Sequence, residues 1–274
     1  MKQYTKKVNM GLLFVLFQAF LYGAFLTLDL TGGSIDLSKI IKFSIIILCF
    51  CYALFNNMSA GRSIICFPGS QNKGLHSFTK RKSQTKSDHI SQCLQAALFF
   101  TVISDLFILM LDYYLYGVLT FILVQLLYEM KLIMVQRAKV KGRIDLGVLR
   151  VLSIRIALQV SIAGIVCIIL QQMGLVLENL LIATVFYFIC ILTNTIIAIR
   201  VAIINPKAKE NVIFAIGMFL FLLCDINVGL FNLSGFISMP ENLYAQIYTL
   251  SSILMWTFYA PAQVLIALSV RRSW

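Results

Sequence analysis

Long runs of apolar residues, separated by short polar stretches, repeat along almost the whole chain. Eight of these runs approach the roughly 20 residues that an α-helix needs to cross the hydrocarbon core of a bilayer. The pattern predicts an all-α fold, a polytopic membrane helical bundle with about eight transmembrane helices in a single integral membrane domain over 1–274. The predicted spans are 11–29, 40–56, 93–112, 115–135, 148–170, 176–200, 211–231 and 247–269.

The overall composition supports this class. Hydrophobic residues make up 60% of the chain and the mean hydropathy is +0.89, whereas soluble domains contain about 45–50% apolar residues. No small-residue cleavage site follows the first apolar run, so we expect a retained helix and not a signal peptide. The seven cysteines are odd in number and lie mostly inside apolar runs. Their setting suggests neither a disulfide framework nor a metal site, and we expect no bound metal.

The distribution of positive charge predicts the orientation. With eight spans both termini share one side, and all but two of the 23 Lys and Arg residues fall on that side. Lys39 and Lys42 are the two exceptions. The positive-inside rule then places both termini in the cytoplasm. The net charge of +12 therefore reflects topology, and nucleic acid is not an expected partner because the basic residues are spread over several short loops.

One polar segment is much longer than the others. Residues 57–92 are predicted to form a long polar cytoplasmic loop. A solvated loop is the simpler interpretation, and contact with anionic lipid headgroups is the alternative. The chain has neither glycosylation-rich loops nor targeting signals, which favours the plasma membrane of a prokaryote. The oligomeric state is not indicated.

Two aspartates, Asp105 and Asp225, fall inside predicted spans. A charged side chain at the centre of a bilayer costs about 2.5–3.5 kcal/mol on insertion scales. Each lies about seven residues before the outer end of its span, hence ~10 Å below the outer boundary. Seven residues further along the same helix faces come Asp112 and Asn232. Acids inside a membrane that face a cavity are candidate functional groups.

The spans that follow each aspartate return with polar residues of their own. Span 4 has Gln125 and Tyr128, span 8 has Tyr259 and Gln263, and span 6 adds Asn194. Spans 3–4 and 7–8 therefore form a weak parallel repeat. These residues either line a site with the aspartates or only form hydrogen bonds between helices, and the sequence leaves both interpretations open.

Short motifs follow one another in a recognisable order. They are Ser104-Asp105 followed by Gly117, Phe121, Gln125 and Tyr128, then Phe221 with Cys224-Asp225, then Tyr259, Ala262, Gln263 and Ile266. This order resembles the lysoplasmalogenase (YhhN-like) family of eight-span membrane proteins. The chain looks like a divergent member, because it departs from the family pattern at four positions. Those positions are Ser104 for Gly, Cys224 for Ser, Gln125 for His, and Phe43 for the Pro after Lys42.

The resemblance implies an activity. Characterised family members cleave the vinyl-ether bond of lysoplasmalogen, a lysophospholipid, and release a fatty aldehyde and a glycerophospho-base. Vinyl ethers hydrolyse by acid catalysis, so the resemblance implies that Asp105 and Asp225 act as acid and base without any cofactor. Tyr259 and Gln263 are then expected to orient them. The remaining implied roles are support from Gln125, Tyr128 and Asn194, and headgroup or mouth contacts from Lys42, Asp112 and Asn232.

Two other functions remain open. Acids at one depth and pseudo-repeated halves also suit a proton- or cation-coupled transporter. Neither aspartate has a Gly or Pro break beside it, which argues against this, and Pro261 is the one candidate helix interruption. A non-catalytic lipid-binding membrane protein, in which the acids only brace the bundle, is the third interpretation.

Overall fold

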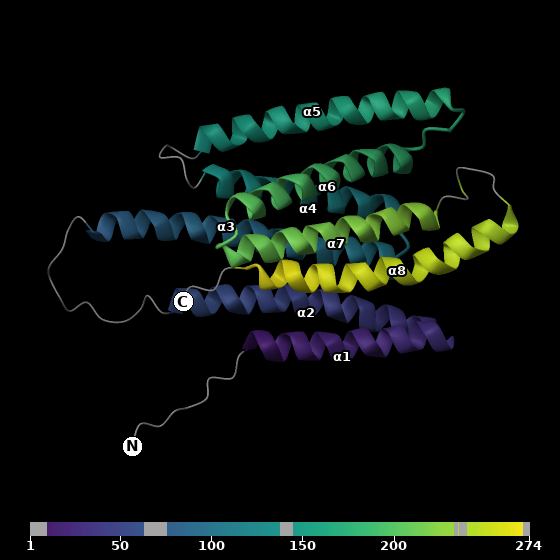
Figure 1. Ribbon diagram of the computed structural model, residues 1–274, viewed down its shortest axis with the longest axis horizontal. Coiled ribbons are helices and arrows are strands. Elements are labelled where there is room, and N and C mark those ends of the chain that lie inside the picture. The colour runs from purple at the N-terminus through teal and green to yellow at the C-terminus, as the bar shows by residue number, and fades with distance from the viewer. Residues whose placement is uncertain (1–9, 63–75, 138–144, 233–234, 236–239, 271–274) are drawn as a thin grey trace, which may run out of the picture.

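Figure 1 shows the computed structural model, which describes residues 10–62, 76–137, 145–232, 235 and 240–270. Over these residues the chain forms eight α-helices, one short π-helical segment and no strand, which confirms the predicted all-α class. The elements are α1 (Met10–Thr31), α2 (Ile35–Arg62), α3 (His76–Asp105), η1 (Leu106–Met110), α4 (Tyr114–Arg137), α5 (Asp145–Gln172), α6 (Asn179–Ile204), α7 (Lys209–Phe231) and α8 (Glu241–Leu268).

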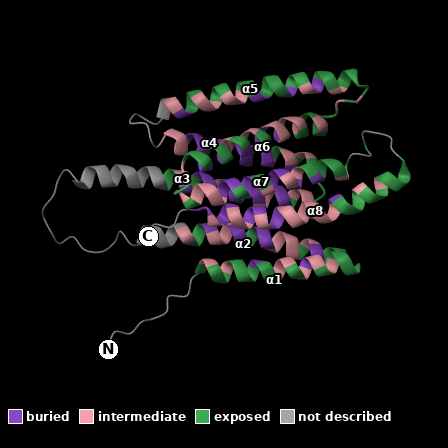
Figure 2. Ribbon diagram, in the orientation of Figure 1, coloured by how far each residue is buried: buried purple, intermediate pink, exposed green. Residues whose placement is uncertain are grey.

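Each of the eight helices is long and apolar enough to cross a membrane. Large apolar side chains also remain exposed on the outer surface of the bundle, for example Phe20 on α1 and Leu158 and Ile165 on α5. Figure 2 shows this exposed character along α1 and α5. A soluble protein would bury such side chains against a core, whereas here the hydrocarbon of the bilayer covers them. The chain is an integral membrane protein.

The polar segment predicted as a loop over 57–92 is largely helical. Helix α2 continues to Arg62 and α3 already begins at His76. No Gly or Pro occurs between His76 and Gln92, and the Lys, Arg and Gln residues there are good helix formers. The membrane-spanning part of α3 therefore extends outward as a polar helix. Residues 63–75 lie outside the described part of the chain.

Six of the helices close into a ring. Around it the order of contacting neighbours is α2, α3, α4, α6, α7 and α8, and α8 contacts α2 again. Helix α1 lies outside the ring against α2 and α8, and α5 lies outside it against α4 and α6. Figure 1 shows α1 and α5 at opposite edges of the bundle. Side chains that point inward from the six ring helices therefore meet one another.

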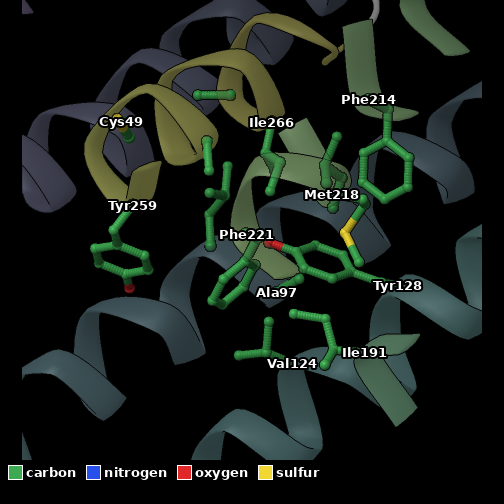
Figure 3. Close-up of a cluster of buried hydrophobic side chains, with 14 of the residues drawn as sticks. Cys49, Ala97, Val124, Tyr128, Ile191, Phe214, Met218, Phe221, Tyr259 and Ile266 are labelled. Atoms are coloured by element: carbon green, nitrogen blue, oxygen red, sulfur yellow. The ribbon is translucent and has the colours of Figure 1, made fainter. Parts of the chain in front are cut away.

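The interior of the ring is a densely packed apolar cluster. Tyr128, Met218 and Phe221 are at most 1% exposed, and Figure 3 shows them in one cluster in which Phe221 lies next to Tyr259. Helices α7 and α8 approach each other closely at Gly217, where a Cβ atom would lie 3.1 Å from the carbonyl oxygen of Ala262. Only glycine allows this approach without moving a backbone.

Candidate functional site

The first of the two aspartates is held by a tyrosine from across the ring. Asp105 is the last residue of α3 and Tyr259 belongs to α8. The Tyr259 hydroxyl donates a hydrogen bond of 2.6 Å to Oδ2 of Asp105, and both residues are buried. This hydrogen bond is short, and it joins two residues that are 154 positions apart in the chain.

The backbone changes its winding at Asp105. Five residues of π-helix, Leu106–Met110, follow it directly. The chain then ends the span at Asp112, whose φ of 54° is in the left-handed region. On the facing helix, Gly117 lies so close to the carbonyl oxygen of Ser104 that a Cβ atom would be 3.3 Å from it. Single π-helical turns are frequent at functional sites because they re-aim side chains.

The second aspartate is held in the same way by a different helix. The Tyr187 hydroxyl of α6 donates a hydrogen bond of 2.7 Å to Oδ2 of the half-buried Asp225 on α7. A buried amide network lies beside this pair. Asn194 Nδ2 donates to the backbone oxygen of Gln125 at 2.8 Å and to its Oε1 at 3.1 Å, and the Gln125 side chain also interacts with Tyr187.

A row of aromatic rings connects the two tyrosine–aspartate pairs. Tyr187 contacts Phe121 with ring centroids 5.8 Å apart, Phe121 contacts Phe221 at 5.8 Å, and Phe221 contacts Tyr259 at 5.5 Å. The carboxyl groups of Asp105 and Asp225 are also near enough to each other for an electrostatic interaction. The two acids therefore belong to one region inside the ring. A cavity that both carboxyl groups share stays a prediction.

Lys42 extends this region toward the end of the bundle where α1 ends and α2 begins. Its Nζ forms an ion pair of 2.7 Å with Asp29 and lies 5.0 Å from the ring centroid of Trp256. Trp256 in turn contacts Tyr259 edge-on at 5.3 Å. Lys42 is thus one aromatic residue away from the Tyr259–Asp105 pair. Its charge is matched by Asp29, so together they form a zwitterionic contact surface.

Two more residues expected to support the site lie within the ring. Tyr128 is fully buried, packs edge-on against Phe214 at 5.5 Å and is near enough to Asp105 for an electrostatic interaction. Gln263 lies one turn after Tyr259 on α8 and is also fully buried. Among the described residues, neither its Oε1 nor its Nε2 has a hydrogen-bond partner. Buried amides are normally satisfied, so Gln263 has hydrogen-bonding capacity available for a ligand.

The two residues expected at the mouth are exposed at helix ends. Asp112 follows η1 and accepts a long hydrogen bond of 3.4 Å from the Tyr114 hydroxyl. Asn232 follows α7, and its Nδ2 donates 2.8 Å to the oxygen of Val228. Each of them therefore contacts its own chain segment. The structure does not bring either residue into contact with the tyrosine–aspartate pairs.

Sequence reasoning missed Tyr187. An isolated tyrosine in an apolar helix attracts no attention, because the ring is apolar and its hydroxyl is accommodated easily. Its spacing does contain a signal: Tyr187 precedes Asn194 by seven residues, so both project from one face of α6. The weak repeat also predicted a different partner for Asp225, because it paired spans 7 and 8. In the structure the hydrogen-bond partner of Asp225 comes from α6 and not from α8.

This geometry can perform proton transfer in an apolar setting. Two carboxyl groups lie in one region inside the ring, each fixed by a phenol hydroxyl on one oxygen, and aromatic rings link the two phenols. Such a pair is suited to donate and accept one proton each, because removal from water and the electrostatic interaction between the two groups both disfavour ionising both of them.

The part of the chain that holds both tyrosine–aspartate pairs matches a known family. The sequence model of the YhhN family matches residues 75–270, which include both aspartates, both tyrosines and six of the eight helices. Curated proteins and solved structures give no match to the chain. The match covers well over half of the sequence, and the chain therefore belongs to the YhhN family.

Proposed function

We propose that the protein hydrolyses the vinyl-ether bond of lysoplasmalogen-type lipids within the membrane. The observation that carries this proposal is the pair of carboxyl groups inside the ring, each held by a tyrosine and linked by aromatic rings. Vinyl-ether hydrolysis needs a proton donor, a site that tolerates an oxocarbenium ion and a group that activates water. The region supplies candidates for all three.

The acid role falls to Asp105, which is the less exposed of the two carboxyl groups. A carboxyl group that is removed from water favours its neutral form. Asp105 transfers its proton to the distal alkene carbon, the carbon–carbon double bond supplies the electron pair, and an oxocarbenium ion forms at the carbon next to oxygen. The faces of Phe121 and Phe221 stabilise this cation as they would any cation over a ring.

The base role falls to Asp225. It takes a proton from water as the water oxygen adds to the oxocarbenium carbon, which yields a hemiacetal. Breaking the bond to the glycerol oxygen then releases the fatty aldehyde, while the hemiacetal hydroxyl loses a proton and the glycerol oxygen gains one. The proton held by Asp225 returns to Asp105 and restores the starting state. These residues need no cofactor for this sequence of steps.

Lys42 and Gln263 are the proposed contacts for the polar part of the substrate. The Lys42–Asp29 pair complements a phosphate and an amine, because it presents one charge of each sign. The unpartnered amide of Gln263 supplies a donor and an acceptor near the reacting bond. We further propose that both termini are cytoplasmic, that the membrane is the plasma membrane of a prokaryote, and that the aspartates lie toward its outer face.

Aldehyde release from lysoplasmalogen by the purified protein tests the proposal. Asp105→Asn and Asp225→Asn are each expected to lower turnover by more than ~10²-fold, since an amide neither donates this proton nor acts as a base. Asp112→Asn is the matched control, because it removes the same charge from an exposed position. Equal, mild effects of all three replacements would show that the aspartates only brace the bundle.

One observation favours a second function, a proton-coupled transporter. The π-helical segment Leu106–Met110 interrupts regular α-helix beside an intramembrane acid, and transporter sites often use such irregular helices. Pro261, in contrast, lies inside the continuous helix α8. Proteoliposomes loaded with a pH-sensitive dye distinguish the two functions. Proton flux that requires Asp105, without aldehyde release from any lysoplasmalogen, would favour transport.

A further inference from the structure

A second site lies at the other end of the bundle. A cavity of about 610 Å³ opens where α4, α6 and α8 end and α7 begins. Lys131, Arg155 and Arg200, from three different helices, contribute to its lining and define what we call the basic cavity. Phe121 of the aspartate region and Lys131 are ten residues apart on α4, hence ~15 Å along the helix axis. The basic cavity therefore lies further along α4 than the aspartate region, and Phe214 contacts both Lys131 and Tyr128.

The cavity has excess positive charge. Among the residues that line it, Glu210 is the carboxylate that accompanies the three cations. A second carboxylate, Glu129, is fully buried behind the wall with Oε1 3.9 Å from Nη1 of Arg155. Nη2 of Arg155 donates a hydrogen bond of 3.0 Å to Oε1 of Gln136. Even with both carboxylates counted, one positive charge remains.

Lys131 is the most unusual member of this lining. Its side chain is 3% exposed, and Nζ has no hydrogen-bond partner in the described part of the chain. The ammonium group lies 3.0 Å from the ring centroid of Phe214 and interacts electrostatically with Glu210. These contacts offset part of the cost of burying a charge but provide no hydrogen-bond acceptor for its three N–H groups. An anion in the cavity would provide one.

An apolar groove begins beside the basic cavity. It has a volume of about 370 Å³, and apolar side chains of α6 and α7, among them Ile203, Ile216 and Phe219, make up its lining. The two features use adjacent residues: Arg200 of the cavity follows Ile199 of the groove on α6, and Asn211 of the cavity precedes Val212 of the groove on α7. The groove faces the lipid side of the bundle, since Ile203 is 73% exposed.

We propose that the basic cavity and the apolar groove together bind one anionic phospholipid, with its phosphate in the cavity and an acyl chain in the groove. Arg200 and Arg155 meet phosphate oxygens at the entrance, and Lys131 donates from within. The lipid origin of the phosphate follows from the groove, because a soluble phosphate compound would leave this apolar surface unused. Basic pockets between transmembrane helices are suited to such headgroups. A phosphate group with one net negative charge, such as a singly ionised phosphate monoester, balances the one remaining positive charge.

The test uses lipid-free, detergent-solubilised full-length protein and counts bound lipids by native mass spectrometry. Short-chain phosphatidic acid is the probe. Phosphatidylcholine with the same chains tests the need for net negative charge, and glycerol 3-phosphate, which has no chains, tests the need for the groove. We expect one saturable phosphatidic acid site, with binding at least about tenfold tighter than either comparison compound.

Charge-removing variants locate the site. Arg200→Gln and Lys131→Met are each expected to weaken phosphatidic acid binding about tenfold or more, as the loss of a charge-assisted contact does. Lys207→Gln is the matched control, because Lys207 is exposed in the α6–α7 connection and outside the cavity lining. It should change binding by less than about twofold. Arg200 is also exposed, so its replacement keeps the test valid even when Lys131→Met fails to fold.

Three outcomes would overturn the assignment. Equal binding of phosphatidylcholine would show that charge has no role, and an equal loss in Lys207→Gln would show general surface attraction. Binding of glycerol 3-phosphate as tight as that of phosphatidic acid would assign the cavity to a soluble anion. The readout is binding and not turnover, so its result is independent of the proposed hydrolysis.

Discussion

At the scale of single residues, the hydrogen bonds from Tyr187 and Tyr259 fix how each carboxyl group is presented. In each pair one oxygen accepts the phenol proton, and this restricts rotation of the carboxyl group. Both rings also pack in the aromatic row, so each phenol is held from two sides. Orientation by a second residue is what a catalytic proton donor or acceptor needs if its reacting atom is to stay in place.

Removing these hydroxyl groups tests their positioning role. Tyr187→Phe and Tyr259→Phe are expected to lower lysoplasmalogen turnover about 10- to 100-fold, because each change leaves a carboxyl oxygen without its hydrogen bond, and such a loss costs about 1–3 kcal/mol. Folding should persist, since the ring contacts remain. Tyr248→Phe is the control: its ring stacks on Phe231 at 4.3 Å outside the site. Unchanged turnover in both site variants would contradict the positioning role.

The sequence revealed the residues that are costly in a membrane and missed those that are not. Asp105 and Asp225 stood out because a carboxyl group in the bilayer needs an explanation. Tyr259 was found through its motif, whereas Tyr187 had no motif and no insertion cost. In the sequence, Lys131 counted only as one of the basic residues that predict the cytoplasmic side, although the structure buries it in α4. Its surroundings come from α7, far along the chain, and no local pattern reports them.

At the scale of helices, the close packing of α7 against α8 sets the positions of Asp225 and Tyr259. We expect Gly217→Ala to destabilise the protein by about 1–3 kcal/mol, because the new methyl group would meet the α8 backbone at Ala262 and Ile266. Gly164→Ala is the matched control. It adds the same methyl group to α5, where no atom lies within 4 Å.

Thermal unfolding of the purified protein in detergent measures both variants. The Gly217 variant should unfold at a lower temperature and lose turnover, while the Gly164 variant should behave like the parent protein. An equal shift in both variants would mean that the loss of glycine itself, and not the α7–α8 contact, determines the result.

The apolar runs in the sequence predicted each helix, but they did not predict where each helix begins and ends. The eight predicted spans each correspond to one helix. The extension of α3 back to His76 was not predicted, because a polar stretch looks the same whether it is a loop or a helix surrounded by water. The π-helical turn after Asp105 was not predicted either. It lies where α3 meets α4 beside Gly117, and a contact between two helices at one point produces no periodic pattern of apolar residues in the sequence.

At the scale of the whole molecule, an even number of spans places the start of α1 and the end of α8 on the same side, as Figure 1 shows. We expect that side to be the cytoplasm, because all but two of the Lys and Arg residues lie there. Fusions to a reporter that is active only outside the cell check this. A fusion at Trp274 should be inactive, and one at Gly174, between α5 and α6, should be active. The reverse pattern would contradict the predicted orientation, because it would mean that both termini and the basic cavity lie outside the cell.

The closed ring was beyond what the sequence can predict. Hydropathy gives the number of helices and charge gives their direction, but neither says which helices touch. The bond from Tyr259 to Asp105 links α8 to α3, and that from Tyr187 to Asp225 links α6 to α7. The first bond spans the ring between helices that are far apart in the chain, and the second joins two consecutive helices that contact each other, so both are properties of the assembled bundle.

The ring is completed by a helix that lies outside the matched part of the chain. The family match begins at residue 75, so α1 and α2 precede it, yet α2 fills the place between α3 and α8. The aspartates that we propose as reacting groups and the Lys42–Asp29 pair thus come from separate stretches of sequence. Such modularity allows substrate preference to evolve without disturbing the chemistry. On the proposed function, we expect a chimera that carries the first two helices of another family member to take the headgroup preference of that donor, which aldehyde release from lysoplasmalogens with different headgroups would measure.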